Sequence, residues 1–72
     1  MNYTPKEIGK IIKDTRKRMS ITQKGLALTA GTGVRFIIEL EKGKETSQLG
    51  KVLLVLRTLG IKIIFIAPEG IE

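Results

Sequence analysis

The chain has 72 residues, 42% of them hydrophobic, with no cysteine or histidine and with 13 Lys and Arg against seven Asp and Glu, a formal net charge of +6. A chain of this length forms one domain at most, and its hydrophobic core supplies only about 3 to 5 kcal/mol of net stability. Without cysteine and histidine, neither disulfides nor a good zinc site can add to that stability. Self-association is the remaining way to stabilise the fold. The basic excess favours polyanionic partners such as nucleic acid, although charge alone leaves this open.

The first predicted helix begins after Thr4, within a capping box. Thr4 can cap the free amides of the helix start, Pro5 suits the first helical position, and Glu7 completes the box. Apolar side chains then recur along one stripe: Ile8, Ile11, Ile12 and Met19. The opposite face is basic: Lys6, Lys10, Lys13, Lys17 and Arg18. We expect this face to serve solvation rather than direct DNA contact.

Two short helices joined by a glycine turn are predicted next. Thr22 caps a helix over residues 23–29, and Gly31 ends it because glycine adopts the left-handed conformation without strain. A third helix is predicted over residues 32–41, and the Lys-Gly-Lys sequence at 42–44 ends it. Two helices in this arrangement fit a helix-turn-helix, whose second helix enters the major groove of DNA.

The fourth helix is predicted over residues 48–59, with Thr46 or Ser47 as its cap. Its apolar positions form a stripe: Leu49, Val52, Leu53, Leu56 and Leu59. Leu54 and Val55 widen this stripe beyond the needs of one small core. The excess predicts a second buried surface on this helix.

Residues 61–66 are rich in β-branched and aromatic side chains and are predicted to form a strand. No other segment has this pattern, and a strand without a partner leaves its amides and carbonyls unpaired. We therefore expect pairing with the same strand of a second subunit across a two-fold axis, rather than an extended tail packed alone. The expected dimer contacts are Ile61, Ile63, Ile64, Phe65, Ile66, Leu54 and Val55.

Together these elements predict a mainly α domain of four to five helices with one C-terminal strand that pairs across a homodimer. Residues 1–60 would form the helix-turn-helix domain, 61–66 the dimerisation strand and 67–72 a mobile tail. Residues 1–10 lack the apolar stretch of a signal peptide, and the longest apolar run, residues 63–67, is too short to span a bilayer. We expect a cytoplasmic protein with no membrane segment.

The first turn of the third helix holds the candidates for reading bases. Arg35 can bond both acceptors on a guanine edge, a contact that discriminates by about 1 to 3 kcal/mol. Val34 can meet a thymine methyl group, or it can be a partly buried helix residue. Gly33 allows close approach of the backbone to DNA, or it is only a residue that is compatible with the backbone conformation at the helix start.

Phosphate contacts are expected at both ends of this motif. Gln23 lies at a helix N-terminus, which itself attracts anions, and Lys42 and Lys44 follow the reading helix, although they can also be ordinary solvated lysines. The predicted DNA-binding residues are Thr22, Gln23, Thr32, Gly33, Val34, Arg35, Lys42 and Lys44.

The motif resembles a known family. Thr22-Gln23, Leu26-Ala27, Ala30-Gly31, Ile37, Leu40-Glu41 and Lys42-Gly43-Lys44 match the pattern of phage-repressor-like helix-turn-helix domains of the Xre (Cro/C1) type. Residues 30–60 are similar to HipB-like antitoxins, and the likeness extends over residues 8–66. The resemblance implies a dimer that binds palindromic operators of its own operon and neutralises a HipA-like serine/threonine kinase toxin.

Other functions have little support in the sequence. Gly31-Thr32-Gly33 lacks the rest of a dinucleotide-binding fingerprint, a phosphate-binding loop is missing, and a Ser-His-Asp set is impossible without histidine. We expect no enzymatic activity, no cofactor and no metal. Two alternatives to the antitoxin remain: a free-standing prophage-type repressor without a toxin partner, and an antitoxin that acts mainly as a protein-interaction module.

Overall fold

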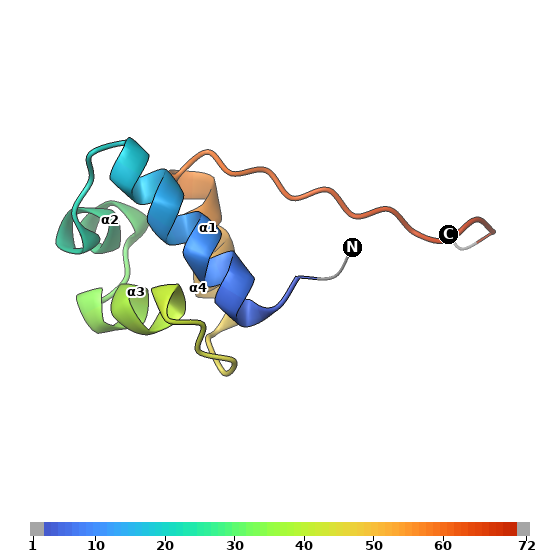
Figure 1. The fold of residues 1–72 in the computed structure, drawn as a ribbon, viewed down its shortest axis with the longest axis horizontal. Coiled ribbons are helices and arrows are strands. Elements are labelled where there is room, and N and C mark those ends of the chain that lie inside the picture. Colours follow the sequence, from blue (N-terminus) through green and yellow to red (C-terminus); the bar gives the residue numbers. More distant parts are fainter. Residues whose placement is uncertain (1–2, 71–72) are drawn as a thin grey trace.

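The computed structural model describes residues 3–70, and this part of the chain contains four helices (Figure 1). They are α1 (Pro5–Arg18), α2 (Gln23–Ala30), α3 (Val34–Glu41) and α4 (Leu49–Thr58). Helix α3 packs against α1 and α2, and α4 packs against α2. The mainly α prediction is confirmed. Within residues 3–70, no helix is long and apolar enough to cross a membrane.

Helix α1 begins in the predicted capping box. The Thr4 hydroxyl accepts a hydrogen bond from the Glu7 amide at 3.1 Å, and the Glu7 carboxylate accepts one from the Thr4 amide at 3.0 Å. Ile12 is fully buried, whereas Met19, expected in the same stripe, is about half exposed. Met19 lies beyond the last helical residue as the C-cap, so the helical stripe no longer directs its side chain inward.

The hydrophobic core draws on all four helices. It consists of Ile12, Leu26, Ala27, Ala30, Ile37, Leu40, Val55, Leu56 and Leu59. Val55 is 0% exposed within a single chain, so its predicted place at a subunit interface is wrong: the core already covers this side chain. Leu54, predicted beside it, remains 41% exposed and is available to a partner.

Two helix starts differ from prediction. Helix α3 begins at Val34 instead of residue 32, because Gly33 has an extended backbone and acts as the N-cap. Helix α4 begins at Leu49 after Gln48, without a side-chain cap. The Ser47 hydroxyl donates to the Lys44 carbonyl instead of capping the helix.

The predicted strand over residues 61–66 does not form within residues 3–70. This segment is extended and runs away from the helices (Figure 1), and Ile64, Phe65 and Ile66 are 81%, 89% and 90% exposed. A strand needs a hydrogen-bonding partner, and a single chain supplies none here. Ile61, predicted as a dimer contact, is partly buried against the core of the single chain. Of the predicted tail, residues 71–72 lie outside the described part.

Candidate nucleic-acid interface

Two of the predicted DNA-binding residues, Thr22 and Gln23, lie at the start of α2. The Thr22 hydroxyl accepts from the Gly25 amide at 2.9 Å, so this hydroxyl caps the helix. The side-chain amide of Gln23 donates to the Glu41 carboxylate at 3.1 Å. The first backbone amides of α2, which have no partner within a helix, are the groups that this end offers to a phosphate.

A buried ion pair, missed in the sequence, fixes this helix end against α1 and α3. Arg16 Nε donates to Glu41 Oε2 at 2.6 Å and Nη2 donates to Oε1 at 3.0 Å, while Nη1 donates to the Ile21 carbonyl at 2.8 Å. Arg16 and Glu41 are both buried. The available signal was spacing, because Arg16 follows the buried positions Gly9 and Ile12 on one helical face.

The turn between α2 and α3 has the predicted form. Gly31 has φ +75°, in the left-handed region, and the Thr32 amide donates a hydrogen bond to the Ala27 carbonyl at 2.9 Å. This compact turn places the start of α3 beside α2, as a helix-turn-helix requires.

Helix α3 has a buried face and an open first turn. Ile37 and Leu40 lie in the core and Glu41 lies in the buried ion pair, so three positions anchor the helix. Val34 is 43% exposed and Arg35 is exposed, both in the first turn. The two predicted base-reading side chains therefore project from one end of α3 into solvent.

The two lysines after α3 differ in their surroundings. Lys42 is the exposed C-cap of α3. Lys44 donates from Nζ to Glu39 Oε1 at 3.0 Å, so part of its charge is already balanced by α3. Of the two predicted phosphate contacts, Lys42 has the less compensated charge.

A shallow hollow of about 260 Å³ lies at the junction of α2 and α3. It brings Thr32 and Val34 together with α2 residues that the sequence prediction did not include: Lys24, Ala27 and Leu28. Leu28 is 82% exposed. Because Lys24 and Leu28 are four residues apart, they share one face of α2 beside α3, and this spacing was a usable signal.

Comparison with known proteins decides the family. A relative from Sinorhizobium fredii, the uncharacterized HTH-type transcriptional regulator y4mF, is 51% identical over 65 residues, which are 90% of this chain and 86% of that protein. The chain belongs to the HTH-type transcriptional regulators. Transcriptional regulators of this type form a non-enzymatic family, as expected. No protein-family model matches the sequence.

Solved structures confirm the HipB-like fold of this regulator. The HipB chain of a HipA-HipB-O2-O3 complex superposes with a TM-score of 0.83 at 20% identity and covers 96% of this chain and 97% of that one. HipB in a complex with an O4 20mer gives the same TM-score, identity and coverage. At this identity the likeness establishes the fold alone.

The regulator offers no clustered metal ligands in the part described. Within residues 3–70, no group of three or more His, Cys, Asp or Glu side chains is arranged to hold a metal ion. Buried side-chain nitrogen and oxygen atoms of these residues all have hydrogen-bond partners. The polar groups of the interior are therefore used by the fold.

Proposed function

We propose that this regulator is a repressor that binds palindromic operator DNA as a homodimer. The observation that carries the proposal is the placement of α3. Ile37 and Leu40 anchor the helix in the core, while Val34 and Arg35 project from its first turn. A major groove accommodates an α-helix in this presentation, with its N-terminal residues at the base edges.

In the proposed complex each side chain has a separate role. Arg35 reads a guanine edge and Val34 meets a thymine methyl group, while Gly33 and Thr32 allow the backbone to approach the DNA. Phosphates are held by the α2 start at Thr22 and Gln23 and by Lys42 and Lys44 after α3. Two such helices in a dimer, about 34 Å apart, would meet successive major grooves.

We further propose that the protein is the antitoxin of a HipA-like kinase, acting in the cytoplasm to repress its own operon and to neutralise the toxin. Support comes from the fold shared with HipB, which occurs with HipA in one of the matched complexes. A free-standing prophage-type repressor would have the same DNA-binding motif. The neighbouring reading frame distinguishes the two, since only the antitoxin requires a kinase gene beside its own.

A second candidate is an antitoxin that acts mainly through protein contacts. The apolar side chains on α4 favour it, because Leu49 is 70% exposed and Leu53 and Leu54 are exposed beside it. Exposed apolar groups of this kind mark protein interfaces when they are contiguous. Under this candidate the kinase is bound tightly and operator binding is weak.

The deciding experiment measures binding to the DNA upstream of the protein's own reading frame, against random duplex DNA, across a salt series. A sequence-specific repressor should prefer the upstream DNA about a thousandfold or more and show a steep salt slope. Equal affinity for the two DNAs would contradict the repressor. Tight binding of the purified neighbouring kinase in that case would support the protein-interaction candidate.

A further inference from the structure

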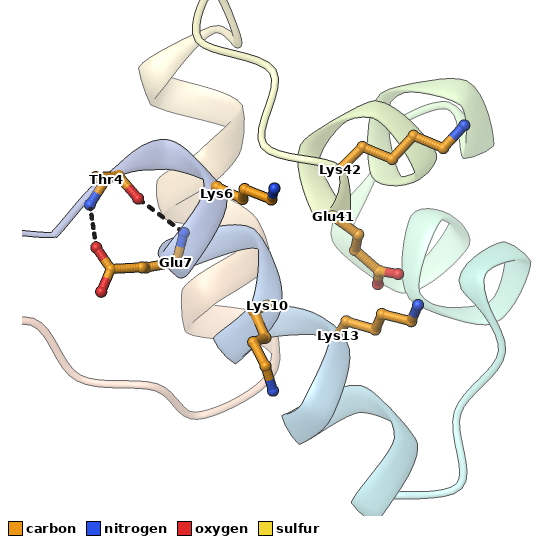
Figure 2. Close-up of a pocket in the computed structure, with 7 residues that line it drawn as sticks. All are labelled: Thr4, Lys6, Glu7, Lys10, Lys13, Glu41 and Lys42. Atoms are coloured by element: carbon orange, nitrogen blue, oxygen red, sulfur yellow. Dashed lines mark hydrogen bonds between the residues drawn. The ribbon is translucent and has the colours of Figure 1, made fainter.

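A basic surface extends beyond the helix-turn-helix, in an open groove of about 560 Å³ between α1 and the end of α3. Its lining residues are Thr4, Lys6, Glu7, Lys10, Lys13, Glu41 and Lys42. Figure 2 shows the α1 lysines along the exposed side of that helix, with Lys13 extending toward Glu41 on the opposite wall. We call this surface the α1 groove.

The carboxylates of the α1 groove are already engaged by other groups. Glu7 accepts from the Thr4 amide in the capping box, and Glu41 is bound by Arg16 and Gln23. Arg16 balances the charge of Glu41, whereas Glu7 keeps its negative charge, so the groove carries four lysines against one carboxylate without a cation.

Three of the four groove lysines are uncompensated. Asp14 pairs with Lys10 at 2.9 Å, and the hydrogen bond from that ammonium lowers the pKa of the Asp14 carboxyl, which stays ionised at neutral pH. Among residues 3–70, the ammonium groups of Lys6, Lys13 and Lys42 make no ion pair. The α1 groove is thus a surface with a net positive charge.

Backbone contacts hold the two walls of the groove together. A Cβ on Gly9 would collide with the Leu40 carbonyl oxygen, and one on Gly43 would lie 2.7 Å from the Lys6 Cα. Both glycines therefore allow α1 and the end of α3 to meet backbone to backbone. The α1 lysines consequently keep a fixed position relative to the reading helix.

The α1 groove also adjoins the proposed phosphate contact at α2. Glu41, on its wall, is hydrogen-bonded to Gln23, the first residue of α2. From that point Lys13, Lys10 and Lys6 continue along one face of α1, since they are spaced by three and four residues. They span about 10 Å along the helix axis, whereas one DNA strand carries a phosphate about every 3.4 Å of its axis.

We propose that the α1 groove binds backbone phosphates of the duplex that flanks the base-read half-site, which lengthens the footprint of each subunit. This inference rests on the proposed DNA-binding function. A row of lysines suits phosphates because contacts to the DNA backbone need charge without base recognition. An acidic protein surface is the less suitable occupant, because lysine is depleted in protein–protein interfaces.

The test uses the double variant Lys6→Gln/Lys13→Gln, which keeps a polar side chain at each position and removes two charges per subunit. Its control is Arg18→Gln/Arg57→Gln, which removes the same charge from exposed positions outside the groove. Affinities are measured for random duplex DNA and for operators with long and trimmed flanks, each across a salt series. Circular dichroism establishes that both variants keep the helical content of the parent.

For the groove variant we expect the salt slope to fall by about three to four per dimer, since each lost phosphate contact removes about 0.9. Its affinity for the long operator should fall to that for the trimmed one, with the preference for operator over random DNA unchanged. The control should retain the dependence on flank length. If the groove variant and the control show the same salt slope and the same dependence on flank length, the proposal is overturned.

Failure of the repressor function gives a different result. In one outcome, the parent protein binds random DNA more tightly than the groove variant does and yet shows no preference for its operator. That result would contradict the sequence-specific repressor and support phosphate binding by the α1 groove. If the parent binds no duplex at all, both proposals are overturned. The random-DNA measurement therefore separates the two.

Discussion

At the scale of single residues, the buried pair of Arg16 and Glu41 connects three helices, α1, α2 and α3. Arg16 comes from α1 and bonds the Ile21 carbonyl in the following loop, and Glu41 ends α3 and accepts from Gln23 of α2. A buried ion pair is a weak source of net stability because desolvation opposes the Coulombic attraction. Its contribution here is orientation, since it sets the start of α2 against the end of α3.

Removing one member of this pair should be far more harmful than removing both. Arg16→Met leaves the Glu41 carboxylate buried without its cation, which lowers the free energy of unfolding by about 3 to 5 kcal/mol, close to all that a domain of this size has. The double variant Arg16→Met/Glu41→Leu should recover most of the loss. Urea unfolding followed by circular dichroism measures both. Equal losses in the single and double variants would contradict this account.

Arg35 and Lys42 should affect DNA binding in different ways. Arg35→Ala removes a proposed bidentate contact with guanine, so the preference for operator over random DNA should shrink by about 1 to 3 kcal/mol. Lys42→Ala should lower the affinity for operator and random DNA by the same factor and reduce the salt slope by about one per subunit. Titration of operator and random duplexes measures both effects. Equal loss on the two DNAs for Arg35→Ala would exclude a base-reading role.

At the scale of the elements, the approach of α1 to α3 is set by a residue without a side chain. Gly9 is buried against the backbone of Leu40 and Glu41, and this contact fixes the distance between the two helices. Glycine is unfavourable within a helix by about 1 kcal/mol relative to alanine. Gly9 therefore lowers the intrinsic stability of α1 but allows it to pack closely against α3.

Adding one methyl group at two helical glycines should therefore have opposite effects. Gly9→Ala places its Cβ against the Leu40 carbonyl, so α1 must move and the free energy of unfolding should fall by about 1 to 3 kcal/mol. At Gly50, in α4, an added Cβ meets nothing within 4 Å, and Gly50→Ala should stabilise by up to about 1 kcal/mol. Urea midpoints compare the two. Stabilisation by Gly9→Ala would show that the helices are not in close contact there.

The helices were predictable because their ends and apolar faces are local features. Thr4 and Thr22 cap α1 and α2 as the sequence indicates, and Gly31 makes the predicted turn. The starts of α3 and α4 were misplaced because Gly33 and Gln48 act as N-caps without side-chain hydrogen bonds. Such starts are set by the packing of the following helix and leave little trace in the sequence.

The candidate site was only partly predictable, for a different reason. Val34 and Arg35 are exposed as a reading helix requires, and their position follows from the motif. The Arg16–Glu41 pair joins residues 25 positions apart, and charge alone does not indicate which of 13 cations would be buried. The α1 groove likewise depends on the approach of two helices that no local pattern specifies.

At the scale of the whole molecule, the chain leaves much of its apolar surface in water. The extended segment after α4 exposes Ile64, Phe65 and Ile66 almost completely, and Leu53 and Leu54 are exposed on α4. Monomeric proteins rarely keep contiguous apolar patches of large size. A second copy can cover these side chains and supply the hydrogen-bonding partner that residues 61–66 lack, which is the arrangement predicted from the sequence.

The protein should therefore sediment at twice the 8.0 kDa of one chain. If residues 61–66 pair as strands, Ile63 and Phe65 project to one face, so Ile63→Asp/Phe65→Asp places four like charges at the interface and should give a monomer that remains helical. Lys62→Gln, in the same segment, is the matched control and should remain a dimer. Sedimentation equilibrium and circular dichroism measure both properties.

Operator binding links this assembly to function. A dimer engages the second half-site at the high effective concentration set by its own geometry, whereas a monomer must bind each half-site independently. The monomeric variant should thus lose affinity for the full palindrome by at least a hundredfold and bind a single half-site as the parent does. A parent protein that sediments as a monomer, or a charged variant that stays dimeric, would mean that residues 61–66 do not join the subunits.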